Sequence, residues 1–333
     1  MAIVTCVCFL LFAIVGYVYN IQRSPAFTSP VDHHFKVEQR HTEDWGTSTK
    51  CDEEIGTTRD ARYVLYGDGP ADEQTTKRLH NYIRSLTSRQ APGGVHLAEE
   101  SESEHFSQIG QSEFVDDLLK GRRQGVFIEC GAADGEGLSN SLFFELHRNW
   151  TGVLIEANPR YHRTLLSKNR NAYVVRACLS TTSKPRTVQY KLANFLSGIS
   201  DKSDDPRSHN IQTTTDVQCF PLNSITAALG IQHVDYLSLD VEGAELDILS
   251  TVDWTQLSVD VITVEYNLKT DILKQLRSLL TANGTFAEVA LLPAGSLLDS
   301  LGQDVVFMRT DQTPNFFRNI GWQAEAIFRR IAS

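Results

Sequence analysis

The segment Phe127–Gly135, FIECGAADG, holds the residues of this 333-residue chain whose types and spacing best suit ligand binding. An apolar run leads directly into a glycine turn, and a helical pattern follows. Open α/β sheets bind ligands at such a turn, at the carboxyl end of a first strand. Gly131 and Gly135 do not have the spacing of the dinucleotide fingerprint, and Ala133 stands where a glycine would admit a pyrophosphate. The spacing disfavours a nicotinamide dehydrogenase and favours a nucleoside without a pyrophosphate, such as S-adenosylmethionine.

A second acidic position follows the next apolar run, GVLIEA, which ends near Glu156. An acid at the end of the second strand can accept hydrogen bonds from two ribose hydroxyls. The alternative is a surface carboxylate that caps the helix expected to begin near Asn158-Pro159. Because the acid, its position and the preceding glycine turn agree, we expect Glu156 to bind ribose.

Acidic residues also crowd the segment Leu239–Glu245, LDVEGAE, at the end of a later apolar run. We expect Asp240 and Glu242 to face the same cleft as Gly131. A strand-end acid is often only a helix N-cap, but three acids in one turn exceed what a cap needs. Asp240 and Glu242 are therefore the candidate catalytic residues, with Asp240 preferred as the base that takes a proton from a methyl acceptor. His233 precedes this strand, and we expect it to lie away from the cleft.

Metal binding is disfavoured by the sequence. The chain has no CxxC pair and no Cys/His cluster, which argues against a structural zinc site. Asp240, Glu265 and Asn267 could offer oxygen ligands to Mg²⁺, but an ordinary strand end and turn is the favoured interpretation of the last two. We therefore expect no metal. The disulfide state is left open for Cys51, Cys130, Cys178 and Cys219.

These motifs need a scaffold, and the sequence from about residue 110 onward alternates short apolar runs with helical patterns. The predicted strands cover residues 126–130, 152–157, 172–179, 235–241, 259–265, 286–292 and 304–309. The predicted helices cover residues 112–120, 139–148, 160–169, 224–229, 244–249 and 271–282. The alternation indicates an α/β fold with right-handed crossovers and a mostly parallel sheet. The segment Ser197–Thr215 interrupts it, either as a lid or as a surface insertion.

The first residues, Met1–Tyr19, carry no charge and approach the length of about 20 residues that crosses a bilayer. Arg23 follows as a charged stop. A cleaved signal peptide would need a basic start, which is missing, and a buried core helix fits the polar sequence behind the run poorly. We expect an uncleaved transmembrane anchor at 1–19, a polar stem at 20–110 with one amphipathic helix over Asp72–Ser88, a main domain at 111–310 and a C-terminal helix or tail at 311–333.

The charge balance bears on the partners. Lys and Arg number 31 and Asp and Glu 41, which gives a net charge of −10. Nucleic-acid binding needs a basic face for phosphates, so we expect no nucleic-acid partner. Asn149-Trp-Thr and Asn283-Gly-Thr are glycosylation sequons, which give weak support for a luminal domain.

Three motifs in order, ECGAADGEGLSN, GVLIEANP and LDVEGAELDIL, resemble the FkbM-type methyltransferases, a class I S-adenosylmethionine-dependent family. The resemblance covers about Gly110–Arg309 and implies a Rossmann-like sheet of seven strands, mostly parallel, with the last antiparallel. It assigns a methionine-end loop to Glu129, Gly131, Ala132, Asp134 and Gly135. It also assigns the ribose acid and its neighbour to Glu156 and Asn158, the adenine side to Cys178 and Leu179, and the acceptor side to Asp240 and Glu242.

The run of segments GQSEFVDDLLKGR, QGVFIECGAADGE, SNSLFFEL and RNWTG, together with the N-terminal span and the stem, is similar to the Star-like group of arthropod proteins. This similarity implies a single-pass protein of the endoplasmic reticulum, Golgi, late endosome and plasma membrane, with a luminal domain. Its implied role is vesicle-mediated transport of membrane-bound protein cargo, such as a growth-factor precursor. The alternative is an active membrane-tethered O- or N-methyltransferase, and the sequence leaves open whether methyl transfer occurs.

Overall fold

The computed structural model describes residues 72–89, 94–98, 105–193, 196–202, 213–266, 269–292 and 303–312. The predicted anchor at 1–19, most of the stem and nearly all of the tail at 311–333 lie outside these ranges. Among the helices within them, none combines the length and the apolar character that crossing a bilayer requires. The amphipathic helix predicted in the stem is confirmed as α3, Glu73–Ser85, which begins where Asp72 accepts a hydrogen bond from the Thr75 amide.

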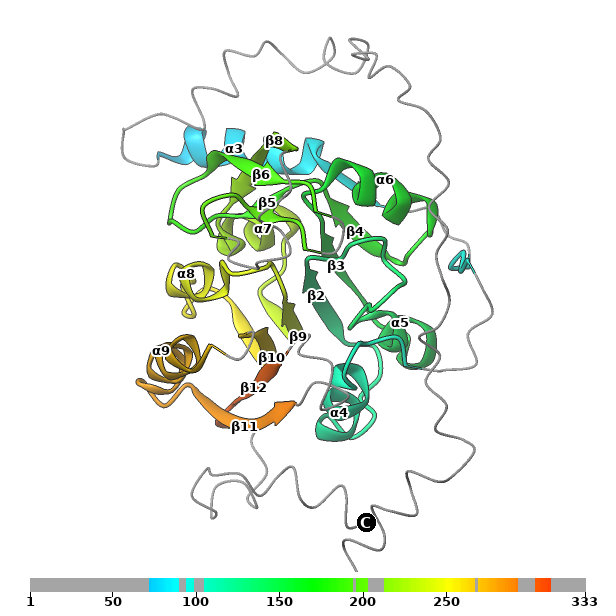
Figure 1. Ribbon diagram of the computed structural model, residues 1–333, viewed down its shortest axis with the longest axis vertical. Coiled ribbons are helices and arrows are strands. Elements are labelled where there is room, and N and C mark those ends of the chain that lie inside the picture. Colours follow the sequence, from blue (N-terminus) through cyan, green and yellow to red (C-terminus); the bar gives the residue numbers. More distant parts are fainter. Residues whose placement is uncertain are drawn as a thin grey trace, which may run out of the picture. The chain divides into compact units, whose positions relative to one another are not determined.

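The main sheet of the described chain is mixed, with parallel strands in its centre and antiparallel strands at both sides (Figure 1). In spatial order its strands are β1 (Thr87–Arg89), β4 (Ala172–Val175), β3 (Thr151–Ile155), β2 (Val126–Cys130), β9 (His233–Leu239), β10 (Ser258–Glu265), β12 (Asp304–Arg309) and β11 (Phe286–Leu292). Strands β4, β3, β2, β9 and β10 are parallel, and β12 runs antiparallel to both of its neighbours. The antiparallel last strand is thus confirmed.

The expected count of seven strands was one too few, because β1 adds an antiparallel edge strand beside β4. Its three residues are too short to show an apolar alternation. The Arg176 amide donates to the Leu86 carbonyl just before this strand, at 3.0 Å, and so extends the pairing between the two segments.

Apolar residues fill both faces of the central strands, as expected for parallel strands covered by helices on each side. Consecutive residues of β2 point to opposite faces, since Phe127 and Ile128 belong to two different core clusters. The first cluster contains side chains of α7 (Leu222–Leu229), α8 (Glu245–Ser250) and α9 (Thr270–Thr281). The second contains side chains of α4 (Gln111–Leu118), α5 (Leu142–Arg148) and α6 (Pro159–Ser167). The six helices predicted between residues 112 and 282 are therefore present, with ends shifted by a few residues.

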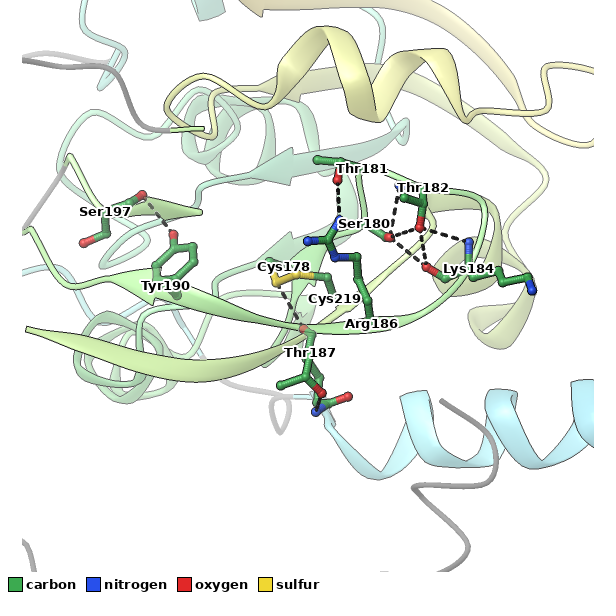
Figure 2. Close-up of a disulfide and its surroundings, with 11 residues drawn as sticks. Cys178, Ser180, Thr181, Thr182, Lys184, Arg186, Thr187, Tyr190, Ser197 and Cys219 are labelled. Carbon is green, nitrogen blue, oxygen red and sulfur yellow. Dashed lines mark hydrogen bonds between the residues drawn. A yellow bond between two sulfur atoms is a disulfide. The ribbon is translucent and has the colours of Figure 1, made fainter. Parts of the chain in front are cut away.

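A second sheet stands beside the first and contains β5 (Cys178–Leu179), β8 (Thr214–Phe220), β6 (Arg186–Lys191) and β7 (Gly198–Ile199) in spatial order. It corrects the single strand predicted over 172–179. That segment breaks after Val175, and its last residues pair with β8 instead of β3. A disulfide between Cys178 and Cys219 joins β5 to β8 (Figure 2).

Candidate functional site

A cavity of about 370 Å³ opens where β2, β9 and β10 end at their carboxyl sides. This edge of a parallel sheet is where α/β proteins bind ligands. Of the residues predicted for the site, the cavity is lined by Glu129, Gly131, Ala132, Glu156, Asp240 and Glu242. The topology therefore brings the three sequence motifs together at one place.

The turn after β2 depends on Gly131, whose φ of +81° lies in the left-handed region that glycine tolerates best. Its amide donates to the Ile155 carbonyl at 3.1 Å. A Cβ at Gly131 would lie 1.9 Å from the carbonyl oxygen of Asp240. The side-chain position thus faces the end of β9, so packing of the two strand ends accounts for this glycine without a ligand.

Glu156 is buried at the cavity wall, and backbone groups hold both of its carboxylate oxygens. The Ala133 amide donates to one oxygen at 2.7 Å, and the Asn158 amide donates to the other at 2.6 Å. Burial raises the pKa of Glu156 to about 7, while these amide donors act in the opposite direction. The Ala157 amide also acts on this carboxylate, and because a carboxylate has about four acceptor positions, acceptor capacity remains after these bonds.

Glu129, by contrast, is occupied by hydrogen bonds within the protein. Its oxygens accept from the Asn140 amide at 2.7 Å and from the Ser139 hydroxyl at 2.9 Å, and the Ser141 hydroxyl also donates to it. Glu129 lies on β2 and is 4% exposed, so these donors compensate its buried charge. Its carboxylate fixes the loop that enters α5 beneath the cavity.

Asp134, Gly135 and Asn158 do not line the cavity, and each has a structural role nearby. Asp134 accepts hydrogen bonds from the amides of Glu136 and Gly137 at 3.0 and 2.9 Å. The carbonyl of Gly135 accepts from the buried Arg170. Asn158 is the N-cap of α6 and accepts from the Arg160 amide at 3.0 Å. These residues stabilise loops next to the cavity without lining it.

Cys178 and Leu179 line a smaller apolar slot that shares Gly131 and Tyr190 with the main cavity. The resemblance assigned them to the adenine side, but neither residue lines the main cavity. Cys178 is held in the disulfide, so its sulfur has a structural partner.

Asp240 stands at the cavity wall beside a second carboxyl group, that of Glu265 at the end of β10. Burial raises the pKa of Asp240, and a hydrogen bond with Glu265 acts against this shift. The pKa of Glu265 lies well above its usual range, because the group is buried and faces the charges of Asp240, Glu242 and Glu245. The pair is therefore suited to holding a proton or a cation.

The turn that carries Asp240 and Glu242 has an unusual backbone conformation, which hydrogen bonds to Glu245 stabilise. Glu242 has a φ of +62°, unusual for a residue with a side chain. Glu245 accepts hydrogen bonds from the amides of Val241 and Gly243 at 2.9 and 3.1 Å. Burial raises the pKa of Glu245 to about 7. Glu245 thus stabilises the conformation that presents Asp240 and Glu242.

The sequence did not identify Tyr190 and Ser197 as cavity residues. Tyr190 lies on β6, and its hydroxyl donates to the Ser197 carbonyl at 2.9 Å (Figure 2). The described start of the predicted lid or insertion therefore forms part of the wall. The strand containing Tyr190 has no strong apolar alternation, so little in its sequence indicated a cavity residue.

His233 lies at the opposite end of β9 from Asp240, as expected. It stands 3.7 Å from Asp235 and from Asp260. Arg122 forms ion pairs with both aspartates, and Arg309 forms one with Asp260 at 3.2 Å. Two guanidinium groups already balance this acidic cluster.

Comparison with known proteins identifies the domain. The family model described as "Methyltransferase FkbM domain" matches residues 129–286. An FkbM methyltransferase-like domain is therefore present, and the match supports S-adenosylmethionine as its cofactor. No curated protein matches the chain significantly.

Among solved structures, the chain is similar to precorrin-6y C5,15-methyltransferase from Geobacter metallireducens, with 14% identity and a TM-score of 0.36, over 63% of this chain and 93% of that one. It is also similar to the fibrillarin pre-rRNA processing protein of Methanococcus jannaschii. That match has 14% identity and a TM-score of 0.39, over 65% of this chain and 87% of the other.

Proposed function

We propose that the FkbM methyltransferase-like domain binds S-adenosylmethionine in the cavity beside Gly131 and Glu156. The observation that carries this proposal is the way Glu156 is held. Backbone amides fix its carboxylate at the cavity wall, and acceptor capacity remains on its oxygens. A fixed carboxylate of this kind suits the paired hydroxyls of a ribose.

The charge of the cavity supports a cationic ligand. Among the described residues that line it, none is Lys, Arg or His. The acidic lining residues are Glu129, Glu156, Asp240, Glu242 and Glu265. Opposite charges attract strongly where water is excluded, so this wall favours a ligand that carries a sulfonium and an ammonium group.

When bound, S-adenosylmethionine supplies an electrophilic methyl group. The chain's own residues position an acceptor and receive the proton that it releases. Asp240 is suited to this role, because a carboxylate with a raised pKa is a stronger base than an ordinary aspartate. Glu265 beside it shares a hydrogen bond with Asp240, which orients that carboxyl group. An acceptor hydroxyl or amine fits this arrangement.

Calorimetric titration of the full-length chain, purified in detergent, tests the cofactor proposal. We expect saturable binding of S-adenosylmethionine by the wild type and at least tenfold weaker binding by Glu156→Gln. The expectation follows because a hydrogen bond to a charged group contributes about 1.5–3 kcal/mol. Glu113→Gln, an exposed glutamate of α4, is the matched control and should bind as the wild type does. A wild-type chain without heat or thermal shift on adding cofactor would refute the proposal.

A second function, of the Star-like kind, is also proposed. In it, the chain is a single-pass membrane protein of the secretory pathway that helps to move membrane-bound protein cargo through the endoplasmic reticulum, Golgi and endosomes. Its support is the charge-free run Met1–Tyr19, the similarity of the GQSEFVDDLLKGR segment and the Cys178–Cys219 disulfide. Disulfides persist mainly in oxidising compartments such as the lumen of the secretory pathway.

A cell assay of cargo export separates the two functions. We expect Asp240→Asn to leave export of a membrane-bound growth-factor precursor intact, since holding cargo needs surface contacts more than a proton acceptor. Removal of Met1–Tyr19 should abolish export. An Asp240→Asn chain that is folded, normally expressed and yet blocks cargo exit would show that the chemistry of the site is needed.

A further inference from the structure

Three carboxylates from neighbouring elements meet beside the cavity. Asp240 follows β9, Glu245 is the first residue of α8 and Glu265 is the last residue of β10. One oxygen from each lies within 4.8 Å of the other two. We propose that Asp240, Glu245 and Glu265 bind one divalent cation.

The spacing of the oxygens suits a single ion. Ligand oxygens on opposite sides of one cation are separated by twice the metal–oxygen distance. This oxygen–oxygen separation is about 4.2 Å for Mg²⁺ and about 5 Å for Ca²⁺. The three carboxylates can therefore reach a Ca²⁺-sized ion almost as they stand, and a smaller Mg²⁺ or Mn²⁺ after a slight closure. Carboxylate oxygens are also the ligands that these hard cations prefer.

An independent observation comes from Glu265. Its residue is 7% exposed, and it lines the cavity. Its Oε2 atom is buried and accepts from no N–H or hydroxyl group of the described residues, and the hydrogen bond of this side chain is shared with another acid, Asp240. A buried carboxylate oxygen without a donor is costly, and a bound cation would satisfy it.

The second acidic cluster of the described chain provides a contrast. There, Asp235 and Asp260 already pair with Arg122, and Asp260 also pairs with Arg309. At the proposed site, no described Lys, Arg or His lines the cavity. Glu245 is oriented by the Gly243 amide, which lies 3.1 Å from each of its oxygens. In the Asp235–Asp260 cluster, arginine side chains supply the positive charge. At the proposed site, a bound cation would supply it.

This inference revises the expectation from sequence that no metal binds. Sequence spacing suggested Asp240, Glu265 and Asn267, whereas folding brings Glu245 into the ligand set. With the cation bound, Asp240 would be a ligand and not the base; the cation would instead bind an acceptor through oxygen and lower the pKa of its hydroxyl, whose proton would pass to water. That consequence rests on the proposed methyl transfer, whereas cation binding itself does not.

The test is a titration of the chelator-treated full-length chain with Mn²⁺ and with Ca²⁺, without S-adenosylmethionine, followed by calorimetry and by the electron paramagnetic resonance signal of free Mn²⁺. We expect one saturable site per chain. Glu265→Gln should weaken binding at least tenfold, and Asp240→Asn should do the same. Asp271→Asn removes an exposed carboxylate of α9 and should bind as the wild type does.

Absence of saturable binding of both ions by the wild type would overturn the proposal. Unchanged affinity in Glu265→Gln would overturn it as well, because the ion would then occupy another site. A thermal unfolding curve for each variant separates loss of the site from loss of the fold. Cofactor titration without metal reports on the proposed function separately, so either proposal can fail while the other stands.

Discussion

The carbonyl oxygen of Asp240 occupies the space that a Cβ at Gly131 would take, and Gly131 also has a φ of +81°. We therefore predict that Gly131→Ala lowers the free energy of unfolding even in the absence of cofactor. Left-handed backbone alone costs about 1–2 kcal/mol for a residue with a side chain, and the close approach adds to this cost. The free energy of unfolding in urea measures the loss.

Gly230 supplies the matched control for that prediction. Its φ is +73°, but a Cβ there would meet nothing within 4 Å. Gly230→Ala should therefore show only the backbone cost, and Gly131→Ala should exceed it by about 1–3 kcal/mol, the range for an overpacked site. Equal losses of unfolding free energy in the two variants would mean that the end of β9 shifts away from the new Cβ at no cost.

Glu156 links cofactor affinity to pH, because burial raises its pKa to about 7. We predict that affinity for S-adenosylmethionine rises by about tenfold between pH 6 and pH 8, since the ionised carboxylate accepts both ribose hydroxyls and the protonated acid does not. Calorimetry across this range measures the change. Glu156→Gln should lose it, while any titration of the ligand itself remains in both proteins.

The same raised pKa affects the stability of the protein alone. Glu156 titrates near 4.5 when unfolded and near 7 when folded, so the folded state binds the proton more tightly. Its contribution to stability is present below about pH 4.5 and is lost as the pH rises through 7.

For the cofactor prediction, a wild-type affinity for S-adenosylmethionine that is flat from pH 6 to pH 8 would contradict the assigned role of Glu156.

The sequence predicted that residues of a special type at strand ends would lie together, and the structure places them around one cavity. Gly131, Glu156 and Asp240 each follow an apolar run, and parallel strands bring their carboxyl ends together. Glu265 was weighed only as a weak metal ligand, because one acid after an apolar run also fits an ordinary turn. Tyr190 had no signal, since its place in the cavity depends on the second sheet.

At the scale of elements, the buried strands were predictable and the partly exposed ones were not. The strand β2 is apolar on both faces and was predicted with its observed ends. In contrast, β8 has the sequence TTDVQCF and is exposed at its start. Its pairing with β6 is non-local, so neither composition nor period indicated a strand there.

The Cys178–Cys219 disulfide is the covalent link of this second sheet, with a sequence separation of 41. We predict that Cys219→Ser lowers the free energy of unfolding by about 2–4 kcal/mol, because the unfolded chain regains the freedom of that loop. Urea unfolding under oxidising conditions measures the loss.

Reduction provides the control for the disulfide. In excess dithiothreitol, the wild type should lose stability and approach the Cys219→Ser variant. A peptide pair linked through Cys178 and Cys219 should appear in a non-reduced digest of the wild type. A wild type that is insensitive to reductant would contradict the prediction.

At the scale of the whole molecule, the order of the strands decides where the site forms. β2 lies between β3 and β9, although β9 follows it by more than a hundred residues along the chain. β12 inserts between β10 and β11. Periodicity cannot give such an order, and the resemblance of the motifs to a family implied only seven mostly parallel strands with the last antiparallel. The order places the Gly131 turn, Glu156 and the Asp240 turn at adjacent strand ends.

The proposed membrane topology is open to a direct test at the two sequons. Asn283 is exposed between α9 and β11, and Asn149 is exposed at the end of α5 beside the fully buried Trp150. We predict that the domain is luminal and that Asn283 carries an N-linked glycan, while Asn149 is modified less because its neighbour is packed in the core. The full-length chain made in secretory cells should shift on glycosidase treatment. Asn283→Gln should remove most of that shift, and Asn149→Gln should remove little. Digestion of the domain by protease added to the cytosolic side of sealed microsomes would overturn the luminal assignment.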